Sequence, residues 1–145
     1  MQAVFFMSMK KISLLLLLFC PIAAPAQDLQ EITQTIHWYF EGMMERNREK
    51  LEQAFIPEAK LIGYRGTKLF VTPFEDWASS TAKGETRDPK LFRNEIKGIR
   101  IVGNMALAET ELYWPGIRYY DFLTLIKVQG AWKIVHKSWH ETPNP

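Results

Sequence analysis

The chain has 145 residues, of which 18 are Lys or Arg and 16 are Asp or Glu, and its formal net charge is +2. The excess comes from Lys10 and Lys11, so the rest of the chain is neutral and has no stripe of basic residues. The chain therefore lacks the basic surface by which proteins bind nucleic acids, and a nucleic-acid-binding function is excluded. A chain of this length builds one hydrophobic core and is too short for two full domains.

Residues 1–26 have the layout of a cleavable secretory signal peptide. The two lysines precede the apolar run Ile12–Cys20, and small residues ending in Ala26 follow it. This run is too short to span a bilayer as a helix, which needs roughly 20 apolar residues. We therefore predict cleavage after Ala26 and an exported protein, periplasmic or extracellular, without a stable membrane anchor. The alternatives are an uncleaved anchor and a lipidated Cys20, although Phe19 stands where lipoprotein signals favour a small residue.

Cys20 is the only cysteine of the chain and leaves with the signal peptide. The mature domain, residues 27–145, therefore has no disulfide, no cysteine metal ligand and no cysteine nucleophile. Its three histidines are scattered, and it contains no glycine-rich phosphate loop. The sequence predicts neither a metal site nor a cofactor.

An apolar stripe predicts a helix from about Asp28 to Arg46. Its members recur three and four residues apart: Leu29, Ile32, Ile36, Tyr39, Phe40 and Met43. Asp28 is placed to cap the helix start. Asn47 is placed to end the helix, because asparagine tolerates the left-handed conformation.

A second short helix, with Leu51, Ala54 and Phe55 facing inward, is expected to stop at Pro57. The period then becomes extended, and residues 60–64 and 67–71 flank a glycine-containing turn, which predicts a hairpin. The run 72–75, Thr-Pro-Phe-Glu, is typical of a helix start, with Thr72 as the cap. It predicts a third short helix.

The last third of the chain predicts only strands, at residues 92–102, 105–114, 118–128 and 131–139. Each separator carries a glycine, as tight antiparallel connections require. The order is helices, a hairpin, a helix and a four-stranded meander. It predicts an α+β domain in which a curved antiparallel sheet packs on three helices.

The segment 120–137 resembles the C-terminal signature of the putative lumazine-binding family, which lies within the nuclear transport factor two-like (SnoaL-like, ketosteroid-isomerase-like) superfamily. It contains Asp121-Phe122-Leu123-Thr124-Leu125-Ile126-Lys127 and then Gly130-Ala131-Trp132-Lys133-Ile134-Val135-His136-Lys137. Residues 39–42, Tyr-Phe-Glu-Gly, look like the opening Tyr-x-x-Gly segment of that family. The chain departs from the family at Arg46-Asn47, where an acidic or Gly-Asp turn is common, and at His136, where asparagine is common.

The resemblance implies a cone-shaped domain that opens at one end. Relatives with this shape include ketosteroid isomerases, polyketide cyclases, dehydratases and proteins without a known reaction. They commonly form homodimers through the outer face of the sheet, and the resemblance implies the same here. Nothing in the residues encodes recognition of lumazine, and a fold does not by itself imply a function.

Six residues are candidate ligand contacts in such a cone: Tyr39, Trp77, Tyr113, Asp121, Trp132 and His136. Aromatic walls suit a concave and mostly apolar pocket. Strict alternation along the last strand puts Trp132, Ile134 and His136 on the face toward the helices, and Lys137 and Trp139 on the opposite face. Each candidate also has a structural interpretation, as a core aromatic residue, a satisfied inward histidine, or an ion pair of Asp121 with Lys137 or Arg118.

Three functional hypotheses follow. The first is an exported protein that binds a small apolar or aromatic ligand and has no firm catalytic activity. The second is an isomerase, cyclase or dehydratase that uses Asp121 and His136 as an acid–base pair, which requires both side chains to face one cavity. The third is a dimeric interaction module, in which Val135 and Trp139 lie in an apolar patch on the outer sheet face.

Overall fold

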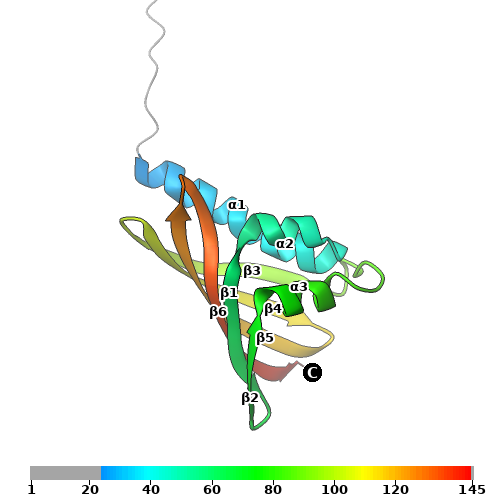
Figure 1. Cartoon of the computed structure of the whole chain (residues 1–145). Coiled ribbons are helices and arrows are strands. Elements are labelled where there is room, and N and C mark those ends of the chain that lie inside the picture. Colours follow the sequence, from blue (N-terminus) through cyan, green and yellow to red (C-terminus); the bar gives the residue numbers. More distant parts are fainter. Residues whose placement is uncertain (1–23, 145) are drawn as a thin grey trace, which may run out of the picture.

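The structure is a computed structural model and describes residues 24–144 (Figure 1). The elements run in the order α1 (Ala24–Glu45), α2 (Arg48–Ala54), β1 (Phe55–Arg65), β2 (Lys68–Pro73), α3 (Phe74–Thr81), β3 (Arg93–Val102), β4 (Met105–Trp114), β5 (Gly116–Val128) and β6 (Ala131–Asn144). Three helices pack on one side of a curved, open sheet, as the sequence predicts for an α+β domain. The predicted signal peptide lies outside the described residues except for its last residues.

The six strands are ordered β2-β1-β6-β5-β4-β3, and four of the five strand pairs are antiparallel. The exception is the pair of β1 and β6, which is parallel and corrects the expectation of a wholly antiparallel sheet. Parallel strands need a long crossover connection. Here that connection consists of everything between the first strand and the last, so no local turn signal marks it.

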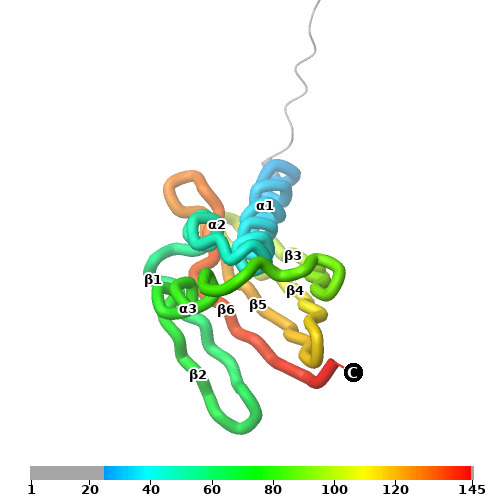
Figure 2. Tube along the Cα trace, turned by 90° about the vertical axis from the view of Figure 1, so that its right-hand side faces the viewer, coloured from blue at the N-terminus to red at the C-terminus, as the bar shows by residue number. Residues whose placement is uncertain are grey.

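The β1–β2 hairpin projects beyond the rest of the sheet (Figure 2). The turns of the meander follow the predicted glycines. Between β5 and β6, Gln129 and Gly130 have φ angles of 50° and 84°. This pair of left-handed residues is the geometry of the two-residue turns that match the twist of a hairpin.

Helix α1 buries the predicted stripe. Ile32, Ile36 and Tyr39 are fully buried, whereas Leu29 is half exposed. The helix begins at Ala24, so Asp28 lies inside it and does not cap it. Asp28 instead accepts hydrogen bonds at Oδ1 from Lys127 Nζ and Trp132 Nε1, at 2.7 and 2.9 Å, which attach the start of the helix to the sheet.

The junction between α1 and α2 also differs from the prediction. Arg46, at φ 58°, takes the left-handed position after α1, and Asn47 caps α2 by accepting from the Lys50 amide. Helix α2 ends at Ala54, before Pro57, because Phe55 already begins β1. None of the helices in residues 24–144 is long and apolar enough to cross a membrane.

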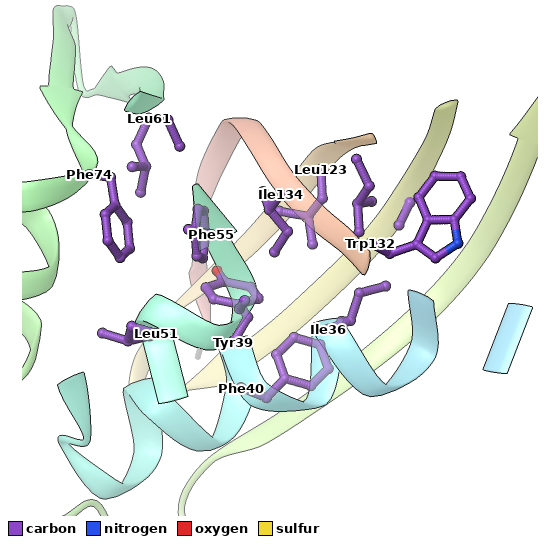
Figure 3. Packing of buried hydrophobic residues seen from close by; sticks show 14 of the residues in the cluster. Ile36, Tyr39, Phe40, Leu51, Phe55, Leu61, Phe74, Leu123, Trp132 and Ile134 are labelled. Atoms are coloured by element: carbon purple, nitrogen blue, oxygen red, sulfur yellow. The ribbon is translucent and has the colours of Figure 1, made fainter. Parts of the chain in front are cut away.

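An aromatic cluster joins α1 and α3 to strand β1 (Figure 3). Phe55 stacks on Phe74 at a centroid distance of 5.1 Å and meets Tyr39 edge-on at 5.6 Å. Phe74 is the first residue of α3, whose cap position is Pro73 rather than the predicted Thr72. In Figure 3, Trp132 lies at the opposite end of the core from Leu61 and Phe74. The core is therefore filled at the end near the start of α1.

Candidate functional site

A cavity of about 390 Å³ lies at the other end, between α3, the β1–β2 hairpin and the distal parts of β4, β5 and β6. Its size falls within the range of small-molecule sites. Its walls carry aromatic, arginine and small polar side chains. The rings and long charged side chains in its lining include Trp77, Trp114, Tyr119, Lys137 and Trp139, together with Arg46, Arg65 and Arg87.

A buried polar trio lies at the floor of this cavity. Tyr39 Oη donates to Asp121 Oδ2 at 2.7 Å, and Lys137 Nζ lies 2.6 Å from Tyr39 Oη and 3.0 Å from the same carboxylate oxygen. Asp121 is fully buried and the Lys137 side chain is 8% exposed. Burial, followed by the Asp121 charge and hydrogen bond, raises the pKa of Tyr39 well above its ordinary value. Of the three residues, Lys137 lines the cavity, and it separates Tyr39 and Asp121 from it.

A β-bulge explains why Lys137 faces inward. Leu125 pairs with Ile134, but the next pair along the strands is Thr124 with His136, so Val135 is an extra residue in β6. An extra residue reverses the alternation of all later side chains in that strand. Lys137 thereby shares a face with the buried Leu123, its partner across the sheet, and His136 turns to the outer face.

Two predictions fail for this reason. Asp121 pairs with Trp139 across β5 and β6, so the two side chains share a face of the sheet. His136 is three residues from Trp139 along β6, so its side chain lies on the other face. Asp121 and His136 therefore form no acid–base pair. Trp139 lines the cavity and so does not belong to an outer apolar patch. The structural interpretation of Asp121 as the partner of Lys137 is the one that the geometry confirms.

The aromatic walls are built around Gly63, which pairs directly with Trp139 across β1 and β6. A Cβ atom added at Gly63 would lie 2.3 Å from Trp139 Cδ2, so the indole packs on bare backbone. On the other wall, Trp114 and Tyr119 meet edge-on at 5.3 Å. Gly63 lies in β1, within the predicted strand 60–64, and its lack of a side chain makes room for the Trp139 ring.

Three arginines stand around the cavity. Arg46 donates to the backbone carbonyls of Thr81 and Glu85, at 3.0 and 3.1 Å. Arg87 donates to the Met43 carbonyl, and its guanidinium carbon lies 4.5 Å from the Trp114 ring centroid. Arg65, at the exposed end of β1, lies over the Phe70 ring at 5.3 Å.

The six candidate contacts are distributed as follows. Trp77 lines the cavity, and Tyr39 and Asp121 lie directly behind Lys137. Tyr113 lies outward, since its neighbours Leu112 and Trp114 line the cavity. Contact of any of the six with a ligand stays a prediction.

Trp132 and His136 lie elsewhere. Trp132 is buried at the closed end of the core, where its indole donates to Asp28. His136 is on the outer face, as the bulge requires. Neither residue lines the cavity.

Sequence reasoning names Lys137 only as an ion-pair partner of Asp121 and does not assign Lys137 or the three arginines to a ligand site. Arg46 belongs to a charged run that suggests a solvated helix face, and Arg48 and Lys50 do form ion pairs with glutamates there. The left-handed turn at Arg46 directs it elsewhere. Arg87 comes from the loop after α3, where periodicity carries no information. Within residues 24–144 no group of three His, Cys, Asp or Glu side chains is arranged to hold a metal ion.

Comparisons with known proteins agree with the fold. A crystal structure of an NTF2-like protein of unknown function from Silicibacter pomeroyi superposes with a TM-score of 0.75 at 22% identity, covering 81% of this chain and 98% of that one. A second such protein, from Shewanella baltica, gives a TM-score of 0.74 at 28% identity, covering 81% and 96%. Among curated proteins, the aldolase FrzH of Cladobotryum sp. is 22% identical over 123 residues, 81% of this chain and 94% of that protein.

Residues 27–140 match the family described as Putative lumazine-binding. This span contains every element from α1 to most of β6 and all the cavity residues named above. The chain belongs to the putative lumazine-binding family and has the nuclear transport factor two-like fold.

Proposed function

We propose that this domain binds a small organic molecule with an aromatic or apolar body in the cavity between α3 and the sheet. The observation that carries the proposal is a cavity of about 390 Å³ with indole and phenol rings in its walls and a packed core behind it. Small-molecule sites combine aromatic surface, which holds the body of a ligand, with polar side chains that orient it, and this cavity offers both. The family assignment supports a ligand-binding role.

A fluorescent apolar probe, N-phenylnaphthylamine, tests this proposal by titration. We expect saturable binding that is lost in Leu112→Trp, because Leu112 is 1% exposed and lines the cavity. Leu107→Trp is the matched control, since Leu107 lies on the same strand, faces the opposite way and is 39% exposed. Ser80→Trp, at the rim, serves as a second filling variant. Binding that persists in both filling variants would show that the probe occupies another surface.

A second candidate function is carbon–carbon bond chemistry on a carbonyl compound. The buried Lys137, at the cavity floor beside Tyr39 and Asp121, supports it, as does the similarity to the aldolase FrzH. In this scheme Asp121 takes a proton from Lys137, whose Nζ then attacks the carbonyl carbon. The C–N bond forms, the carbonyl oxygen leaves as water, and the resulting imine activates the neighbouring carbon.

Borohydride trapping tests this candidate. Naphthaldehyde and borohydride are added together, and peptide mass spectrometry locates the reduced adduct. Selective labelling at Lys137 that disappears in Lys137→Arg is the expected result. Lys133 is the internal control, because it lies in the same strand outside the cavity, with its Nζ hydrogen-bonded to the Gln53 carbonyl. Labelling spread over exposed lysines would refute the candidate.

Export and dimerisation belong to the same proposal. Cleavage after Ala26 would leave Asp28, which attaches α1 to the sheet, in the mature chain. Mass spectrometry of the secreted protein is expected to find Gln27 at its start.

A homodimer is supported by a row of exposed apolar side chains on the outer face of the neighbouring strands β4 and β5: Met105, Leu107, Phe122 and Ile126.

A further inference from the structure

Positive charge is concentrated around the cavity. Its lining contains Arg46, Arg65, Arg87 and Lys137 but a single carboxylate, that of Asp76. Over the chain outside the predicted signal, acidic and basic residues balance. Lys137 is neutralised from behind by Asp121, so the imbalance comes from the three arginines.

These arginines form no ion pair within residues 24–144. Arginines elsewhere in the described chain behave differently. Arg48, Arg93 and Arg118 each lie within 3.5 Å of a glutamate oxygen. Only Arg100, exposed on β3, is likewise without a carboxylate partner there. Among the arginines of the described residues, those without a carboxylate partner are therefore the three at the cavity and one at the surface.

Two of the three guanidinium groups are held in place without being neutralised. Arg46 and Arg87 bond to backbone carbonyls, which fix their positions but carry no full charge. Burial, and then the neighbouring Arg46 charge, lower the pKa of Arg87. Two like charges so close to each other cost free energy, and an anion between them would remove that cost.

We infer that the cavity selects organic acids, with a carboxylate or sulfonate group at Arg46, Arg65 and Arg87 and an aromatic body between the tryptophan-lined walls. The planar guanidinium fork matches the two oxygens of a carboxylate, and such charge-assisted hydrogen bonds are roughly twice as strong as neutral ones. Trp77, Trp114 and Trp139 line the same cavity and supply flat surfaces for the body. This inference rests on the proposed function, because it specifies the ligand of that site.

A matched pair of probes separates the two claims. Naphthoate and naphthalenemethanol share the ring system and differ in the charge of one substituent. Isothermal titration calorimetry at low salt is expected to show naphthoate binding roughly tenfold or more tightly, as a hydrogen bond to a charged group implies. The preference should shrink as added salt screens the partly exposed arginines. Equal affinities would overturn the anion inference alone, whereas absence of binding by both would overturn the proposed function as well.

Substitutions then locate the anion site. Arg87→Gln and Arg65→Gln are each expected to weaken naphthoate binding about tenfold and to weaken naphthalenemethanol binding much less. Arg100→Gln removes the same charge from an exposed position outside the cavity and should change neither affinity. The Arg65 guanidinium makes no hydrogen bond within residues 24–144, so Arg65→Gln is expected to fold even if Arg87→Gln does not. Unchanged naphthoate affinity in Arg65→Gln would overturn the inference, whether or not Arg87→Gln folds.

Discussion

Replacing Lys137 with methionine is expected to cost the domain about 3 kcal/mol of unfolding free energy. Methionine keeps the length and packing of the aliphatic stem, so the loss comes mainly from the ion pair. Asp121 is fully buried, its Oδ1 has no hydrogen-bond partner within residues 24–144, and the Tyr39 hydroxyl would remain the donor to Oδ2. Removing one partner of a buried pair costs about 3–5 kcal/mol, and we take the lower end because Lys137 borders a cavity.

Urea unfolding at neutral pH, followed by tryptophan fluorescence and circular dichroism, measures this loss. Lys50→Met is the control, because Lys50 pairs with Glu41 and Glu45 at the surface and should lose far less. The double variant Asp121→Leu/Lys137→Met removes both charges, and we expect it to be more stable than Lys137→Met alone. If the unfolding free energy of Lys137→Met lay within about 1 kcal/mol of that of the parent protein, Asp121 would not depend on Lys137 as the partner of a buried ion pair, and the reasoning would be refuted.

Three further predictions follow from other parts of the structure. Gly63→Ala should destabilise the domain by about 1–3 kcal/mol because its Cβ meets the Trp139 ring, whereas Gly98→Ala, with no atom within 4 Å, should be close to neutral in chemical unfolding. Hydrogen bonds from Lys127 and the Trp132 indole lower the pKa of Asp28. The contribution of Asp28 to stability is therefore present above the pKa of the unfolded chain, about 3.9, and is lost as the pH falls through the lower pKa of the folded state. The stability of Asp28→Asn should accordingly depend less on pH in that acidic range than the stability of the parent protein does. Phe122→Glu should convert the proposed dimer into a monomer in size-exclusion chromatography, and an unchanged elution volume would rule out that face.

The fold was predictable because its signals are local. The spacing of apolar residues in α1 places Ile32, Ile36 and Tyr39 in the core, and all three are buried. Glycine-containing separators mark each turn of the meander, and the turn at Gln129 and Gly130 has the left-handed geometry that such a separator implies. These features depend on a few neighbouring residues, so a sequence displays them directly.

The parallel pair of β1 and β6 could not be predicted in this way. Phe55 pairs with Ile134, and Gly63 pairs with Trp139, across almost the whole length of the domain. No turn joins these strands, so the pairing depends on the shape of the complete sheet. The position of the cavity depends on it too, because Trp139, which packs on Gly63, lines the cavity.

Three of the four charged groups of the candidate site are missed for a common physical reason, which is that each lies where the backbone leaves its regular repeat. Arg46 occupies a left-handed position after α1, Arg87 a loop, and Lys137 a strand whose phase is reversed by the bulge at Val135. Periodicity assigns side chains to faces only while the repeat continues, so it identifies the core and fails at the cavity. Sites where local rules break are often the functional ones, since a regular helix or strand would turn these charges toward water. In this domain the same irregularities that defeat prediction bring two of the three arginines and the lysine to one cavity, whereas Arg65 reaches it from the end of a regular strand.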